Sequence, residues 1–176
     1  MNQSQMSSKI HDKIQIAGFK SNIKDFNGVM EKISRISRIN SDCVVQIMDA
    51  DGIAGRKHVM HAAIHAVNAF QRNENIAKDL GLEICVRTSA QRQISRALDI
   101  LGIQEGEMNI CAVAVGCDNG VMVKLGDFLG EMDDSVLEPD ETVLKKIYNI
   151  SDMELETIGS IERLLMEKTS LLILEK

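Results

Sequence analysis

The sequence predicts an α+β (mixed α/β) fold: a single domain with a sheet of about four strands covered by helices, and a helical C-terminal part. Apolar runs with the periodicity of strands alternate with amphipathic helical patterns as far as residue 116, and the later patterns are helical. The chain has 176 residues, which is near the usual size of one domain. We therefore assign residues 9–176 to one domain and expect the polar residues 1–8 to be mobile.

Four segments have the pattern of strands. Residues 13–19 alternate apolar and polar side chains, as a half-buried strand does. Residues 43–48 and 108–116 are apolar runs typical of buried strands, and residues 82–88 are also expected to form a strand. The turn-rich residues 49–55 follow the second of these strands, so the chain is expected to turn there before the next element.

Helical patterns fill the intervals between these strands and the C-terminal part. Residues 25–39 place apolar side chains at helical spacing and predict an amphipathic helix. Further helices are expected at 56–71, at 73–80 with an end at Gly81, from Ser89 to about Leu101, at 119–130, from near Pro139 to Tyr148, and onward from the Ser151–Glu154 capping box.

The composition is typical of a soluble, cytoplasmic protein. Hydrophobic residues make up 44% of the chain and charged residues 26%. No apolar run approaches the roughly 18 residues that cross a bilayer, and the polar N-terminus lacks the apolar core of a secretory signal. The four cysteines, Cys43, Cys85, Cys111 and Cys117, lie in or at the end of strand-like runs and form no C-x-x-C pair. We predict that they are reduced, buried thiols that bind no metal.

Charge is distributed unevenly along the chain. Residues 54–96 carry seven basic and three acidic side chains, whereas residues 97–176 carry six basic and 17 acidic ones. The net charge of the whole chain is −6, which argues against a general nucleic-acid-binding protein. The contrast between the basic middle and the acidic C-terminal part suggests two surfaces with different partners, although an ordinary solvated surface can have the same composition.

The predicted helix that begins at residue 56 carries the most chemical information. At about 100° per residue, one side of this helix is apolar and the opposite side carries a polar, potentially cationic stripe. The stripe consists of His58, His61, His65, Asn68 and Arg72.

Three interpretations of this stripe are open. His61 and His65, at positions i and i+4, could share a metal ion, but no further ligand in the segment completes the set. The stripe could be an ordinary polar helix face, with histidines that bond to neighbouring elements. It could also bind anions, because Arg56, Lys57 and Arg72 flank histidines that can donate hydrogen bonds to phosphate.

Motifs for catalysis are weak or missing. Asp49 and Asp51 could hold a magnesium ion, but aspartates after a strand ordinarily accept backbone N–H groups in a turn. The sequence has no phosphate-binding loop, dinucleotide-binding motif or nucleophile motif. We therefore predict a protein that is not an enzyme and needs no cofactor. The alternative is a histidine-dependent metal-binding enzyme or sensor.

A set of short motifs runs through residues 49–103. They are Ala54–Gly55 with His58, Ala69–Phe70 at the end of an alanine-rich helix, Asn75–Ile76, and Ser89 with Arg92–Gln93–Ile94. With these motifs the segment resembles the kinase-binding subunit of the KEOPS (EKC) tRNA-modification complex of archaea and eukaryotes. Ala90 departs from the pattern, since members of that family often have glycine there, and the departure puts the local turn in doubt.

The resemblance implies a function. Members of the family bind a small atypical protein kinase, which is itself attached to a carbamoyl-transferring ATPase-like subunit, and the assembly installs threonylcarbamoyl on an adenosine of certain tRNAs. The kinase-binding subunit is not catalytic. It supports the kinase and, in archaea, helps to hold the tRNA through its 3′ end. In this chain the basic middle offers an RNA surface, for which we expect Arg56, Lys57, His58, His65, Arg72 and Arg92.

Kinase binding needs apolar side chains that the core does not use. The predicted helix at 25–39 and the C-terminal segment are the candidates, although both could equally pack on the sheet. The residues expected at the kinase interface are Phe26, Met30, Ile158, Ile161, Leu165, Leu171 and Leu172.

Overall fold

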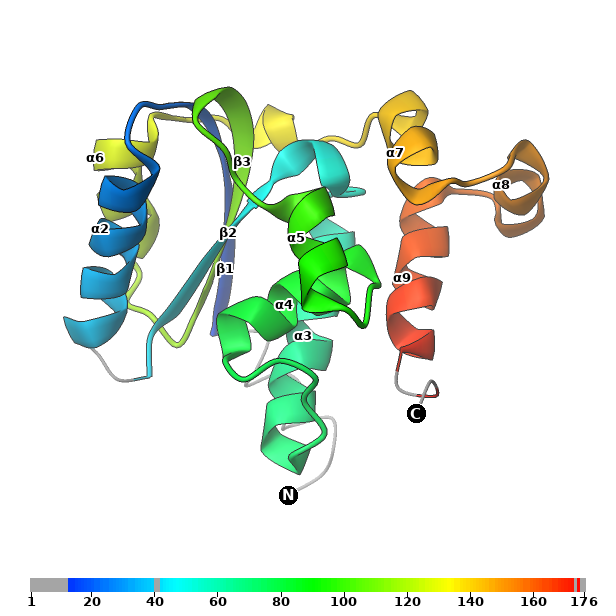
Figure 1. Ribbon diagram of the computed structural model, residues 1–176, viewed down its shortest axis with the longest axis horizontal. Coiled ribbons are helices and arrows are strands. Elements are labelled where there is room, and N and C mark those ends of the chain that lie inside the picture. Colours follow the sequence, from blue (N-terminus) through cyan, green and yellow to red (C-terminus); the bar gives the residue numbers. More distant parts are fainter. Residues whose placement is uncertain (1–12, 40–41, 173, 175–176) are drawn as a thin grey trace.

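The computed structural model describes residues 13–39, 42–172 and 174. In this part of the chain, a four-stranded antiparallel sheet lies between two layers of helices, and a third group of helices packs beside one of them (Figure 1). The strands are β1 (Ile14–Ile23), β2 (Val44–Asp49), β3 (Gly106–Val115) and β4 (Glu131–Met132), in the order β2-β3-β1-β4. The predicted fold class is confirmed.

Helices cover both faces of the sheet. They are α2 (Phe26–Ile39) and α6 (Val121–Leu129) on one face, and α3 (Arg56–Arg72), α4 (Leu80–Ser89) and α5 (Ile94–Leu101) on the other. Successive side chains of a strand point to opposite faces, so Phe19 and Ile110 pack beneath the first layer and Met48 and Val113 beneath the second. Burial on both faces explains why β2 and the second half of β3 are mostly apolar in sequence.

The C-terminal helices form the third group, at the far right of Figure 1. They are α7 (Glu141–Tyr148), α8 (Asp152–Ile158) and α9 (Ile161–Leu171). Leu144, Leu164 and Leu165 form an apolar cluster with Ala54, which lies just before α3. Because α9 packs on α3 and α4, the acidic C-terminal part is attached to the basic helix. Among the described residues, no helix is long and apolar enough to span a membrane.

The predicted strand at 82–88 is wrong, because these residues belong to α4. Asp79 caps this helix by accepting a hydrogen bond from Leu82 N at 2.9 Å, so the predicted helix at 73–80 is also wrong. The helix lies against β2, α3, α5 and α9 and is buried along most of its length. A helix that is buried all round has the same apolar pattern as a buried strand.

Three further features of the secondary structure differ from the prediction. Ser89 ends α4 and does not open the next helix, which begins at Ile94. The fourth strand is the short β4, which pairs with Phe19 and Lys20 of β1. The Ser151–Glu154 capping box is confirmed, but its helix ends at Gly159, where φ is 92°, and α9 then begins as a separate helix. Residues 1–8 lie outside the described part of the chain.

Cys43 and Cys117 are joined by a disulfide, so the prediction of a reduced thiol is wrong for these two residues. The pairing of β2 with β3 explains it. Val44 lies opposite Val115, and the residue before β2 therefore meets the chain just beyond β3, with a Cα–Cα distance of 4.4 Å between the cysteines. Cys85 and Cys111 are free and buried, as predicted.

Candidate functional site

A pocket of about 840 Å³ lies at the C-terminal end of α3. Its wall combines α3, the loop between α3 and α4, the turn that follows α4, and the C-terminal segment. Three arginines line it, Arg72, Arg87 and Arg92, together with His65. Glu74 is the acidic side chain among the described lining residues, so positive charge predominates in the pocket.

The other lining residues give the pocket a polar and an apolar part. Asn68 and Asn75 bring side-chain amides, whereas Ile76, Leu172 and Leu174 bring apolar surface. Sites for small organic ligands typically combine apolar walls with a few fixed polar groups, and their volumes are roughly 300–1,000 Å³. The pocket therefore suits a ligand that has an anionic group next to an apolar one.

Three of the six predicted RNA-binding residues, His65, Arg72 and Arg92, meet in this pocket. Arg56 and Lys57 do not, because they begin α3 while Arg72 ends it. At 1.5 Å per residue, the two ends of the helix are about 24 Å apart. The sequence prediction of one continuous basic face thus becomes two separate groups of basic residues.

Arg56 has partners within the fold. Its guanidinium donates hydrogen bonds to Asp134 Oδ2 at 2.5 Å and to the Ile16 carbonyl at 2.6 Å. Asp134 lies in the short 3₁₀ turn Asp134–Leu137, and its other carboxylate oxygen accepts from Gly18 N at 2.9 Å. Arg56 therefore fastens the start of α3 and this turn to β1.

His58 lies in the core and is fully buried. Its Nδ1 accepts a hydrogen bond from Ala54 N at 3.0 Å, which assigns the ring proton to Nε2. Burial lowers the pKa of His58 to about 4, since the charged ring would be desolvated. An RNA phosphate cannot reach this ring from outside, so His58 is left out of the site that we propose.

His61 and His65 lie one turn apart on α3, and their ring centres are 4.3 Å from each other. His61 Nε2 lies 2.9 Å from the Ser170 hydroxyl of α9, so this ring helps to hold the C-terminal helix. Burial, and then the nearby His61, Arg87 and Arg72, lower the pKa of His65 to about 4. Ser170 occupies His61 Nε2, whereas His65 faces the pocket. Among the described residues, no group of three or more His, Cys, Asp or Glu could hold a metal ion.

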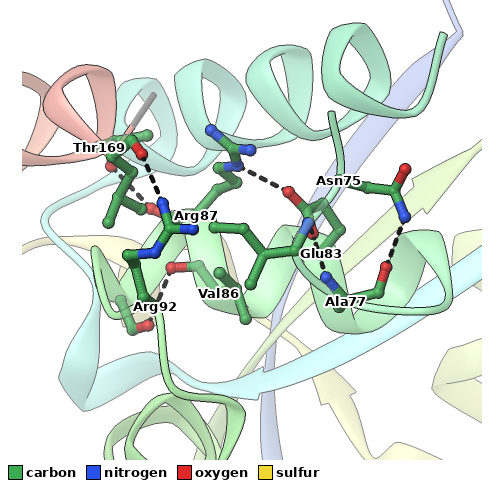
Figure 2. Close-up of polar contacts among 10 residues, drawn as sticks. Asn75, Ala77, Glu83, Val86, Arg87, Arg92 and Thr169 are labelled. Atoms are coloured by element: carbon green, nitrogen blue, oxygen red, sulfur yellow. Dashed lines mark hydrogen bonds and ion pairs between the residues drawn. The ribbon is translucent and has the colours of Figure 1, made fainter. Parts of the chain in front are cut away.

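A buried ion pair lies in the wall of the pocket (Figure 2). Glu83 Oε1 accepts a hydrogen bond from Arg87 Nε at 2.8 Å, and both residues belong to α4. Glu83 Oε2 accepts from the backbone N–H groups of Ile76 and Ala77, at 2.8 Å and 2.7 Å. One carboxylate thus holds both the arginine and the loop between α3 and α4.

Sequence reasoning missed Arg87, because it placed residues 82–88 in a strand. The spacing of Glu83 and Arg87, i and i+4, is typical of an ion pair on a helix. This spacing would have indicated the pair if the segment had been taken as a helix.

The C-terminal segment is tied to the same region. Thr169 Oγ1 donates to the Arg87 carbonyl at 2.7 Å, and Arg92 Nη1 donates to the Leu172 carbonyl at 3.2 Å. Figure 2 shows Thr169 and Arg92 side by side near the end of α9. The end of α9 is therefore part of the pocket wall and is fixed to α4.

The predicted kinase-interface residues fall into two sets. Phe26 and Met30 on α2 and Leu171 on α9 are exposed, at 38%, 40% and 52%. These three side chains are accessible to a partner protein. The other four, which pack wholly or partly inside the protein, are Ile158, Ile161, Leu165 and Leu172.

This chain is similar in sequence to known proteins. Residues 19–172 match the family described as "Kinase binding protein CGI-121". A curated relative, "Regulatory protein Cgi121" of Methanocaldococcus jannaschii, is 35% identical over 148 residues, which cover 81% of this chain and 95% of the relative.

Proposed function

This chain belongs to the CGI-121 family of kinase-binding proteins, and from that premise we propose that it is a non-catalytic subunit of the KEOPS complex. In this proposal it binds the atypical protein kinase subunit directly and the carbamoyl-transferring ATPase-like subunit through the kinase. It also helps to hold the 3′ end of tRNA during threonylcarbamoyladenosine modification, in the cytoplasm.

The observation that carries the RNA-binding part is the pocket at the end of α3. Arg72, Arg92 and His65 were predicted from sequence to bind RNA, and they converge there from α3 and from the turn before α5. Arginine is well suited to phosphate because its planar guanidinium donates two parallel hydrogen bonds.

The shape and lining of the pocket favour a single-stranded end over a duplex. Proteins read single-stranded RNA by receiving unstacked nucleotides into pockets, with contacts to both phosphate and base. Aromatic residues make up only 3% of the chain, so the base would rest on aliphatic side chains such as Ile76, Leu172 and Leu174. The asparagine amides, Asn68 and Asn75, offer hydrogen bonds for ribose or base edges.

The kinase would bind a different surface. Protein interfaces are centred on apolar anchors that are exposed in the free subunit. Phe26 and Met30 meet this requirement on α2, which lies on the opposite side of the sheet from the pocket (Figure 1). Leu171 is exposed too, but it lies beside the pocket.

The RNA-binding part is tested with two forms of one tRNA, intact and lacking its single-stranded 3′ end. We expect the full chain to bind the intact tRNA more tightly by about tenfold or more, because the terminal nucleotides supply the phosphates and bases that enter the pocket. Equal affinities for the two forms would contradict a site for the 3′ end.

The kinase-binding and non-catalytic parts need separate measurements. The wild-type chain should capture the purified kinase subunit, whereas Phe26→Asp with Met30→Asp should not, while the matched surface change Val123→Asp on α6 should have no effect. The isolated chain should show neither ATP hydrolysis nor threonylcarbamoyl transfer. Turnover by the chain alone would refute the non-catalytic assignment.

A further inference from the structure

Arg87 is a buried cation whose hydrogen bonds are incomplete. The residue is 2% exposed, and its side chain lines the pocket at the end of α3. Within the described part of the chain, its Nη1 has no hydrogen-bond partner. A buried guanidinium is costly unless its donors are satisfied, so this open position needs an explanation.

The geometry of Glu83 explains why the protein itself leaves the position open. An arginine and a carboxylate ordinarily form two parallel hydrogen bonds, one to each carboxylate oxygen. Here Oε1 of Glu83 accepts a hydrogen bond from Arg87 Nε, while Oε2 accepts hydrogen bonds from the backbone N–H groups of Ile76 and Ala77. Figure 2 shows this division of the carboxylate between the arginine and the loop. Glu83 thus orients the guanidinium but leaves Nη1 unsatisfied.

We propose that Arg87 is an anion-binding residue of the pocket and that Glu83 is its positioning residue. The ligand class is a phosphate group of an RNA end, and in this respect the inference rests on the function proposed above. Glu83 acts in two ways, because the same carboxylate that orients Arg87 also holds Ile76 and the adjoining Asn75 in the pocket wall.

A phosphate fits the surroundings of Arg87 better than a neutral group does. Arg72 and Arg92 line the same pocket, and a phosphate can accept hydrogen bonds from more than one guanidinium. His65, also in the lining, adds a neutral ring that can donate a further hydrogen bond. Glu74 is the acidic side chain of the described lining, and its one negative charge does not cancel the positive charges of three arginines.

The test compares RNA binding by four forms of the full chain. They are the wild type, Glu83→Gln, Arg87→Met with Glu83→Gln, and the control Arg96→Met, which removes an exposed arginine of α5 outside the pocket. The double variant removes both buried charges together, so that no carboxylate is left unpaired in the core. Thermal melting checks that each form is folded.

The double variant should bind tRNA about tenfold or more weakly, which is the loss expected for one charge-assisted hydrogen bond. Its plot of log affinity against log salt should be less steep by about 0.7, the value for one phosphate contact to a single strand. Glu83→Gln should keep the wild-type slope, because the arginine still neutralises its phosphate. Arg96→Met should match the wild type in both measurements.

A second probe separates the inference from the proposed function. Inorganic phosphate is titrated into the ¹⁵N-labelled chain, and the Nε–H signal of Arg87 should shift in the wild type. If tRNA binds normally to the double variant, with unchanged affinity and slope, the inference is overturned while the proposed function stands. If the wild-type chain binds no tRNA, the proposed function falls. The phosphate titration then decides the inference, which a shift of the Arg87 signal supports and an unchanged signal overturns.

Discussion

The two ends of α3 carry arginines that look equivalent in sequence, yet their surroundings in the fold differ. Arg56, at the start, donates to Asp134 and to the Ile16 carbonyl, so its guanidinium connects three segments of the protein. Arg72, at the end, lines a pocket together with Arg87 and Arg92. The first arginine forms hydrogen bonds that hold the fold together, whereas the second contributes positive charge to a pocket.

This difference shows why a basic segment is not by itself a binding surface. Residues 54–96 have an excess of basic side chains, but the acidic partners come from elsewhere in the chain. Asp134, which pairs with Arg56, lies 78 positions away in sequence. Only the fold reveals which cations are paired, so the two ends of α3 are expected to respond differently to the loss of a basic side chain.

The largest expected effect is on RNA affinity at the pocket end of α3. Arg72→Glu should weaken tRNA binding by about tenfold or more, since it removes a phosphate contact and adds repulsion. Lys57→Glu, a matched reversal of an exposed charge at the other end, should leave the affinity within about twofold. Filter-binding titrations at constant salt measure both. A comparable loss for the two variants would mean that RNA contacts the whole length of α3.

The next effect concerns the C-terminal segment, which lines the pocket through Leu172 and Leu174. Deletion of the residues after Thr169 should weaken tRNA binding by roughly threefold to tenfold, because the apolar wall is lost. It should also weaken kinase binding if Leu171 is an anchor. Met153→Ala, which trims an exposed apolar side chain of α8, is the control and should change neither. RNA affinity that survives the deletion would remove the C-terminal segment from the site.

A smaller effect is expected on stability at the start of α3. Arg56→Ala should lower the free energy of unfolding by about 1 kcal/mol, because the ion pair with Asp134 is partly exposed and screened by solvent. RNA affinity should be unchanged. Denaturant unfolding and RNA titration of the same preparation measure the two quantities. A loss of RNA binding without loss of stability would show that Arg56 also contacts RNA.

The sequence predicted the fold class and singled out three residues that the pocket unites, but it did not predict the pocket itself. Periodicity identified α2, α3 and β3 because each has a clear apolar pattern. It failed for α4, which is buried on several sides and therefore has no polar face to reveal a helix. That failure also hid Arg87, and no local pattern could show that Cys43 would meet Cys117 across two paired strands.

The smallest expected effect is the pH dependence of RNA binding, which concerns His65 in the pocket. Its pKa in the free protein is about 4, lowered mainly by burial and then by His61, Arg87 and Arg72. A bound phosphate favours the charged ring and raises this pKa, so the complex takes up protons that the free protein does not. RNA affinity should therefore be constant between about pH 8 and 7 and rise by roughly threefold towards pH 5.

His65→Gln makes this prediction specific, because glutamine keeps hydrogen-bonding capacity but does not titrate. Affinities are measured from pH 8 to 5 at one ionic strength, and the rise at low pH should disappear in the variant. Thermal melting is needed at each pH, since the folded pKa values of His58 and His65 lie below that of an unfolded histidine, near 6.5. The unfolded chain then binds more protons as the pH falls from 6.5 towards 4, and stability declines over that window. If folded His65→Gln protein shows the same rise in affinity as the wild type, the proton is taken up elsewhere, and His65 does not contact the RNA phosphate.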